Sequence, residues 1–176
     1  NLKVNTTGAD YTDKSVQREY QRIDFYSYLV HIVQRLMNPI QGGKRKGILV
    51  FTRFLKEAER LTMSIPGCAI VSGDTPKSTR EMILKRFKAG EIPVVANVGV
   101  LTTGFDMARP TMSLAMYYQI VGRAIRPHPS KECGWFVDLC GNINRFGEVS
   151  DLRLVDGGNG KWAVYSKGRQ LTNIRF

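Results

Sequence analysis

Three short apolar runs, each separated from the next by a segment with helical periodicity, constrain the fold of this chain most strongly. The runs are residues 48–51, 68–71 and 92–96. Continuous apolar runs of this length are typical of parallel strands that are buried on both faces. The intervening segments carry apolar residues every three or four positions and end at Pro66 and Gly90. The pattern therefore predicts an α/β domain with a mostly parallel sheet, helices on both faces and functional loops at the carboxyl ends of the strands.

The chain before the first run divides into two parts. Residues 1–14 are polar and without period, which indicates a linker or disordered arm. From residue 15 the apolar positions recur at helical intervals, and they predict one amphipathic helix over 15–38 that ends before Pro39. His31 lies on this helix without a second metal-type residue four positions later, so we expect a surface residue and not a ligand.

The period changes after residue 147. Residues 152–155 and 161–165 alternate and flank the sequence Asp-Gly-Gly-Asn-Gly, which predicts a β-hairpin extension over 148–176 with a third strand at 170–174. Trp162 and Tyr165 are expected to pack this hairpin onto a domain of residues 15–147, with stacking on nucleic-acid bases as the alternative.

Two more short strands are expected inside the domain. They are residues 109–114, which lead into a helix, and residues 136–138, which are apolar and end at an aspartate.

Composition favours a polyanionic partner. The chain holds 26 Lys and Arg against 15 Asp and Glu, a formal charge of +11, which suits nucleic acid. Its three cysteines form no C-x-x-C pair, so we expect neither a disulfide framework nor a zinc site, but a cytoplasmic, reducing location. Neither a long apolar run nor a signal-peptide pattern occurs, so a membrane span and export are not predicted. Because the chain begins at Asn1 and not at methionine, we expect a fragment or a processed product.

The pattern Gln119-x-x-Gly122-Arg123-x-x-Arg126 is a candidate phosphate site. On a helix Gln119, Arg123 and Arg126 share one face, and Gly122 would let a neighbouring backbone come close. Guanidinium groups suit phosphate because their planar fork donates two parallel hydrogen bonds and never deprotonates. Taken alone, the pattern also fits a surface helix with two solvated arginines.

The segment after the third apolar run carries a second candidate site. Thr102 and Thr103 offer hydroxyls and amides to a phosphate, and Gly104 permits a backbone shape that other residues resist. Asp106 can accept from a ribose hydroxyl or anchor the arginines. The structural alternative is that Asp106 only caps a turn before Pro110.

The order of these segments resembles motifs IV, V and VI of superfamily-2 helicases. Thr52 and Arg53, after the first apolar run, resemble motif IV; residues 97–106 resemble motif V, and residues 119–126 resemble motif VI. The phrases at residues 109–114 and 141–147 are similar to bacterial and phage members, including RadD-like DNA repair helicases. Arg80 stands at an arginine position of the segment between motifs IV and V, although we expect a solvated helix residue there. The resemblance covers about residues 47–147.

This resemblance implies the second, C-terminal RecA-like motor domain of a DEAD/DEAH-type helicase. It implies that Arg123 and Arg126 are catalytic and reach the γ-phosphate of ATP. The implied nucleotide-binding residues are Gly104, Asp106, Gln119, Gly122, Arg123 and Arg126, and the implied nucleic-acid-binding residues are Thr52, Arg53, Thr102 and Thr103. No metal ligand is implied in this chain, and DNA is favoured over RNA as the nucleic-acid partner.

Two motifs that a complete helicase motor needs are absent from the sequence. Neither the phosphate loop G-x-x-x-x-G-K-[ST] nor an acidic D-E-x-H or D-E-x-D box occurs. ATP and Mg²⁺ would therefore be held mainly by an N-terminal RecA-like domain of the same polypeptide, and the chain alone is predicted to be inactive. A motor subunit of a restriction endonuclease and a non-catalytic nucleic-acid-binding module remain as alternatives.

Overall fold

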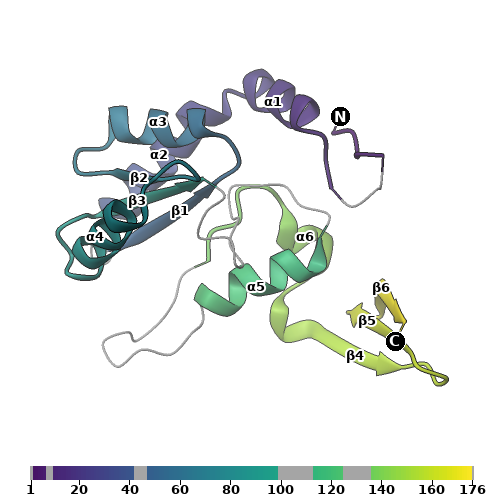
Figure 1. Cartoon of the computed structure of the whole chain (residues 1–176). Coiled ribbons are helices and arrows are strands. Elements are labelled where there is room, and N and C mark those ends of the chain that lie inside the picture. Colours follow the sequence, from purple (N-terminus) through teal and green to yellow (C-terminus); the bar gives the residue numbers. More distant parts are fainter. Residues whose placement is uncertain (1, 7–9, 42–46, 99–112, 125–135, 176) are drawn as a thin grey trace.

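The predicted parallel sheet is present (Figure 1). The computed structural model describes residues 2–6, 10–41, 47–98, 113–124 and 136–175. Within them the strands β1 (Ile48–Thr52), β2 (Ala69–Val71) and β3 (Val94–Val98) pair in parallel in the order β1-β3-β2. The expected third strand begins two residues late, because Pro93 has no N–H to donate to a ladder.

Alternate residues of each strand face two different cores. Val50 of β1 and Val94 and Ala96 of β3 belong to one buried cluster, which also contains residues of the N-terminal helices. Val71 of β2 and Val95 of β3 belong to a second cluster on the opposite face. Because side chains alternate across a strand, this division confirms a sheet buried on both faces.

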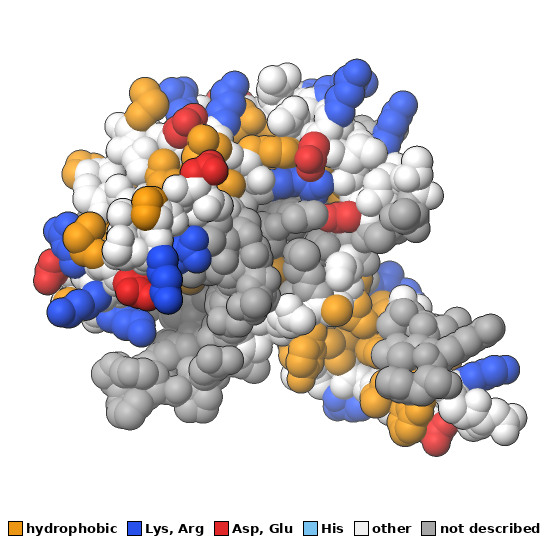
Figure 2. Space-filling view, in the orientation of Figure 1, with side chains coloured by type: hydrophobic (Ala, Val, Ile, Leu, Met, Phe, Trp, Pro, Cys, Tyr) orange, Lys and Arg blue, Asp and Glu red, His pale blue; other side chains and the backbone are white. Residues whose placement is uncertain are grey.

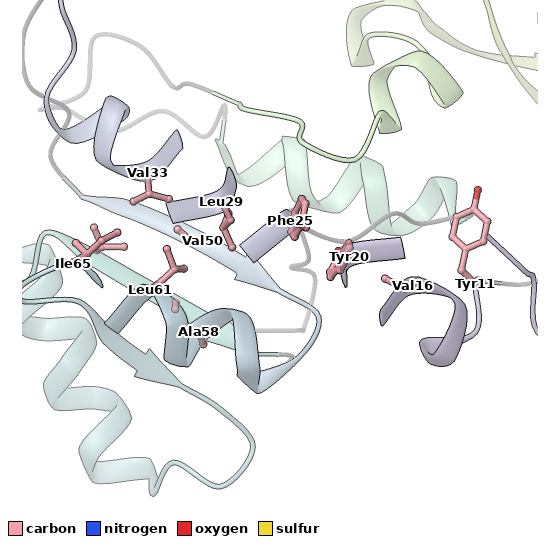
Figure 3. Packing of buried hydrophobic residues seen from close by; sticks show 12 residues of the cluster. Tyr11, Val16, Tyr20, Phe25, Leu29, Val33, Val50, Ala58, Leu61 and Ile65 are labelled. Atoms are coloured by element: carbon pink, nitrogen blue, oxygen red, sulfur yellow. The ribbon is translucent and has the colours of Figure 1, made fainter. Parts of the chain in front are cut away.

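Helices cover both faces. α3 (Leu55–Ser64) packs on the first face, where its Ala58 and Leu61 are fully buried (Figure 3). α4 (Lys77–Lys88) packs on the second face through Ile83 and Phe87. The fold is therefore the mixed α/β arrangement that the sequence predicts, with the carboxyl ends of β1, β2 and β3 at one edge of the sheet.

The single helix predicted over residues 15–38 is wrong in one respect, because it is broken in two. α1 (Asp13–Arg22) and α2 (Phe25–Met37) are separated at Asp24, whose φ of 48° is left-handed. The break lets Tyr20 stack on Phe25 with ring centroids 4.1 Å apart, both rings being buried. In a continuous helix, residues five positions apart would point in different directions, so the shared aromatic core explains the break.

The described part of the N-terminal segment contacts the domain, and the linker or disordered arm expected over residues 1–14 stays a prediction. Val4 and Tyr11 form an antiparallel bridge, and the amide of Asn5 donates to the carbonyl of Asp10 at 2.7 Å. Tyr11 is buried, with 8% of its surface exposed. One buried aromatic ring therefore holds this polar segment in place.

A second group of elements follows the parallel sheet. It contains α5 (Leu114–Ala124), α6 (Asn142–Phe146) and the 3₁₀ turn η1 (Val149–Asp151). Strands β4 (Leu152–Asp156), β5 (Lys161–Ser166) and β6 (Arg169–Arg175) then form an antiparallel sheet in chain order. The predicted hairpin and its third strand are confirmed, and Figure 1 shows this sheet beyond α5 and α6, away from the parallel sheet.

The strand predicted at residues 136–138 does not form. Instead, the carboxylate of Asp138 accepts hydrogen bonds from the amides of Cys140, at 3.1 Å, and Ile143, at 2.7 Å. The carboxylate thus satisfies amides just before and within the first turn of α6, and the segment turns toward that helix instead of extending a strand. The other expected strand reaches Leu114, which begins α5; residues 109–112 lie outside the described residues.

Gly147 directly follows α6 and lies close to β5 of the antiparallel sheet. Its φ is 83°, and a Cβ at this position would overlap Ser166 Oγ of β5 and lie 3.1 Å from Ser166 Cβ. Its carbonyl accepts a hydrogen bond of 2.7 Å from the hydroxyl of Tyr117 on α5. Glycine at this position therefore permits both an unusual backbone conformation and a close approach.

We expect Gly147→Ala to lower the free energy of unfolding by about 1–3 kcal/mol, because it combines backbone strain with overpacking. Gly158→Ala is the matched control, since Gly158 also has a positive φ, 76°, but nothing lies within 4 Å of an added Cβ. Thermal and urea unfolding of both variants measure the difference. Equal losses in the two variants would show that the contact with Ser166 contributes nothing.

Candidate nucleotide and nucleic-acid interface

Thr52 ends β1 at the carboxyl edge of the parallel sheet. It is fully buried, and its hydroxyl donates to the carbonyl of Asn97 on β3 at 3.3 Å. Thr52 thus links β1 to β3 at the carboxyl edge of the sheet, where the candidate functional loops begin. Its predicted contact with nucleic acid stays a prediction, and the hydroxyl is already used inside the sheet.

Arg53 follows Thr52, and its side chain turns toward the N-terminal segment. Only 6% of this side chain is exposed. Its Nε donates to Asp13 Oδ1 at 2.7 Å, and its Nη2 lies 2.6 Å from the same oxygen and donates to the carbonyl of Tyr11 at 2.7 Å. Its Nη1 lies 3.7 Å from Asp10 Oδ2. The predicted phosphate-binding guanidinium therefore contacts acceptors of the chain itself in this structure.

Glu57 closes the amino end of α3, directly after Arg53. Its buried carboxylate accepts from the amide of Phe54 at 2.7 Å and lies 3.4 Å from the amide of Arg53. Free amides at the start of a helix are a common site for a phosphate. At α3 the chain's own carboxylate takes that position, which stabilises the helix and leaves the Arg53 side chain as the cationic group of this loop.

Tyr11 connects this loop to α6. Its ring lies beneath the guanidinium of Arg145, at 5.3 Å from the ring centroid, and its hydroxyl accepts a hydrogen bond from the same group. Its carbonyl accepts from Arg53. One residue of the N-terminal segment thereby contacts both the loop after β1 and the segment that leads to the antiparallel sheet.

The loop after β2 contacts a second arginine, Arg80 of α4. The amide of Ser72 donates to Thr75 Oγ1 at 2.9 Å, and Arg80 Nη2 donates to the carbonyl of Thr75 at 3.2 Å. Arg80 is half-buried, and within the described residues its buried Nε has no hydrogen-bond partner. The expectation of a solvated helix residue at Arg80 is therefore wrong, because the side chain folds back over its own loop.

α5 carries the first part of the predicted phosphate pattern. It buries Tyr117, Ile120 and Val121, which leaves Tyr118 and Gln119 exposed. Gln119 therefore lies on the solvent side of the helix, and the backbone places residue 123 one turn further along that side. Within the described residues nothing lies within 4 Å of a Cβ added at Gly122, so the expected close backbone approach is not seen there.

The remaining predicted site residues lie outside the described residues. They are Thr102, Thr103, Gly104, Asp106 and Arg126, together with the side chain of Arg123. The described residues bring together a different set, namely Asp10, Tyr11 and Asp13 around Arg53. Sequence reasoning missed these three because they are local to a polar segment, and only a contact 40 residues away in the chain gives them a partner.

Comparison with known proteins assigns the family. The model of the helicase conserved C-terminal domain matches residues 28–128, more than half of the chain. The chain belongs to the helicase conserved C-terminal domain family. The matched part of this helicase domain runs from within α2 through α5, and the antiparallel sheet lies outside the matched region.

Curated relatives of this helicase domain are much longer than the chain. It is 37% identical over 93 residues to the putative ATP-dependent helicase IRC3 of Saccharomyces cerevisiae, covering 48% of the chain and 13% of the relative. It is 32% identical over 104 residues to the DNA 3'-5' translocase XPB2 of Sulfurisphaera tokodaii, covering 53% of the chain and 23% of the relative. It is 24% identical over 160 residues to the mitochondrial DEAD-box ATP-dependent RNA helicase 9 of Arabidopsis thaliana, covering 87% and 24%. The matches therefore span about a quarter or less of these relatives.

Two further properties bear on what the helicase domain can bind. In the described ranges, no three His, Cys, Asp or Glu side chains are grouped so that they could hold a metal ion. None of the helices in those ranges is long and apolar enough to cross a membrane.

Tyr117 fixes the orientation of α5, on which Gln119 lies. Its ring stacks on Phe146 of α6 with centroids 5.3 Å apart, and its hydroxyl donates to Gly147. Burial, with the nearby carboxylates of Asp138 and Glu148, raises the pKa of Tyr117 to about 12. The folded protein therefore keeps this proton at a pH where the unfolded chain has lost it.

We expect Tyr117→Phe to lower the free energy of unfolding by about 1 kcal/mol near neutral pH, the usual worth of one hydrogen bond. A raised pKa stabilises the folded state below the unfolded value of about 10, and that contribution is lost as pH rises from about 10 to 12. The deficit of Tyr117→Phe should therefore shrink across this window in urea titrations of both proteins. A stability difference between the two proteins that is constant from pH 8 to 12 would contradict the raised pKa of Tyr117.

Proposed function

We propose that this domain is the second motor domain of an ATP-dependent superfamily-2 nucleic-acid helicase or translocase. One observation supports this most directly: α5 buries Tyr117, Ile120 and Val121 and presents Gln119 to solvent. The pattern that resembles motif VI therefore begins on an exposed helical face, where a second domain could approach.

The division of labour between two domains follows from the chemistry. Phosphoryl transfer is catalysed mainly by positioning and by stabilising charge, and an arginine supplied from a second domain is worth roughly 10³ to 10⁵ in rate. Arg123 and Arg126 would supply that charge to the γ-phosphate, with Gln119, Gly122, Gly104 and Asp106 completing the nucleotide side. In this role the domain needs arginines and no metal ligands.

ATP and Mg²⁺ would be held mainly by the N-terminal motor domain of the same polypeptide. The sequence supports that division, since it contains neither a phosphate loop nor an acidic box of the kind that holds the ion. When bound, Mg²⁺ neutralises charge on the β- and γ-phosphates. The part of this chain is to close the cleft from the other side.

DNA is the proposed substrate, and a RadD-like repair helicase is the proposed subgroup. The relatives include both a DNA translocase, at 32% identity, and an RNA helicase, at 24% identity. The net charge of +11 supports a polyanionic substrate. Thr52, Arg53, Thr102 and Thr103 would lie along the sugar-phosphate backbone.

In the complete enzyme, we expect Arg123→Ala to lower kcat by at least about 10³-fold and to leave nucleic-acid affinity without nucleotide nearly unchanged. Arg123→Lys should also fail, because lysine keeps the charge but loses the planar fork. Steady-state ATPase assays and oligonucleotide binding measure the two effects. Arg60→Ala, an exposed arginine of α3, is the control, and turnover by Arg123→Ala equal to that of Arg60→Ala would refute the role.

The 1–176 chain alone should hydrolyse no ATP above background, because it contains neither a phosphate loop nor a magnesium-binding acidic box. A phosphate-release assay with and without single-stranded DNA checks this. Turnover by the purified chain that persists in Arg123→Ala would contradict the two-domain proposal.

A further inference from the structure

The cage of oxygens around Arg53 is unlike an ordinary surface ion pair. Its acceptors come from residues 10–13, which we call the acidic strap and which contain Asp10, Tyr11 and Asp13. Asp13 contacts Nε and Nη2, the Tyr11 carbonyl contacts Nη2, and Asp10 lies near Nη1. Together they cover the guanidinium so that 6% of the side chain is exposed.

The oxygens around Arg53 belong to the chain itself, and they occupy the positions that the oxygens of a bound phosphate could take. A guanidinium fork prefers several oxygens in one plane, as a carboxylate or a phosphate offers them. Here two carboxylates and one carbonyl supply those oxygens. Glu57 closes the nearby start of α3, so a backbone phosphate that reached this loop would meet the Arg53 guanidinium as its cationic partner.

Among the described residues, one nitrogen of the Arg53 guanidinium receives no hydrogen-bond acceptor from the strap. Arg53 Nη1 is buried, yet within the described residues it has no hydrogen bond, because Asp10 Oδ2 stands 3.7 Å away. Buried donors are normally hydrogen-bonded, and an unmet one costs free energy. A ligand with more oxygens could satisfy this donor better than the strap does.

The two carboxylates of the strap differ in exposure. The Asp13 side chain is 70% exposed, whereas that of Asp10 is 15% exposed. Asp13 is also the first residue of α1, and no side-chain hydrogen bond caps that helix at Thr12. Helix ends open more easily than helix interiors, so the outer carboxylate can leave without disturbing the buried aromatic core.

From these contacts we propose that the acidic strap is an internal mimic of nucleic-acid phosphate. It holds the Arg53 side chain until a backbone phosphate displaces Asp13 from the solvent side. The inference rests on the proposed function, because it takes the loop after β1 as part of the nucleic-acid track. Binding of nucleic acid would then be coupled to movement of the N-terminal segment, and through Tyr11 to Arg145 on α6.

The test weakens the strap without changing its shape, using Asp10→Asn combined with Asp13→Asn in the 1–176 chain. Fluorescence anisotropy with oligo(dT) over a series of NaCl concentrations measures affinity and its salt dependence. We expect up to about fivefold tighter binding at low salt than wild type, the worth of one exposed ion pair. The salt slope should change little, because Arg53 contacts the same phosphate in both complexes once Asp13 has been displaced.

The matched control is Asp24→Asn combined with Glu59→Gln. These two exposed acids change the net charge equally but lie on the α1–α2 junction and on α3. Arg53→Ala should have little effect in the wild-type background and should abolish the gain in the strap variant. Asp13→Asn alone, at the exposed position, should give a smaller gain and serves if the double variant unfolds.

Three results would overturn the proposal in distinguishable ways. An equal gain in the control pair would mean that net charge alone is responsible. A gain that survives Arg53→Ala would mean that the strap covers a different site. In both cases the wild-type chain still binds oligo(dT) and the helicase function stands, whereas absence of binding in all variants would overturn the strap and the nucleic-acid track together.

Discussion

Burial of the β1-β3-β2 sheet on both faces is the constraint from which the rest of the structure follows. Each strand sends alternate residues to opposite faces, so Val94 and Val95 of β3 need separate apolar layers. Parallel strands also need crossover helices, and α3 and α4 provide those layers. As a result the carboxyl ends of the strands lie at one edge, where Arg53 follows β1 and Ser72 follows β2.

α3 alone does not cover the first face of the parallel sheet, and the helices α1 and α2 bury the rest of it. Tyr20 and Phe25 stack beside the sheet because the chain breaks between α1 and α2 (Figure 3). The same arrangement brings residues 10–13 to the loop after β1. A charged guanidinium beside this apolar core needs acceptors, and Asp13 and the Tyr11 carbonyl provide them. Packing of the N-terminal helices on the sheet therefore decides which residues surround Arg53 at its carboxyl edge.

A third buried cluster packs against α5 and fixes its orientation. Tyr117, Val121 and Phe146 form it, with Leu171 of β6 packed against them. This core joins the end of the helicase domain to the antiparallel sheet and sets which face of α5 meets solvent. Basic side chains also lie over α4, whose last turn carries Lys85, Arg86 and Lys88 (Figure 2). Positive charge is therefore spread over the surface, whereas the candidate nucleotide face depends on the orientation of one helix.

The sequence by itself determined the parallel sheet, its covering helices and the C-terminal hairpin. The apolar runs of β1, β2 and β3 and the Asp-Gly-Gly-Asn-Gly turn are local patterns, and local patterns can be read without knowing what they contact. The motif resemblance also anticipated the family that now matches residues 28–128. What it implied for individual residues, such as Arg123, stays a prediction.

Only the tertiary structure decided the break at Asp24, the capping role of Asp138 and the partners of Arg53. Each depends on a contact that periodicity does not encode: a stacked ring pair, the free amides of a helix start, and carboxylates 40 or more positions away in the chain. The helical period was correct on both sides of Asp24, yet the shared core of Tyr20 and Phe25 overrode it. A buried charge likewise selects its partners by proximity in space, and only the folded chain brings Asp10 and Asp13 to Arg53.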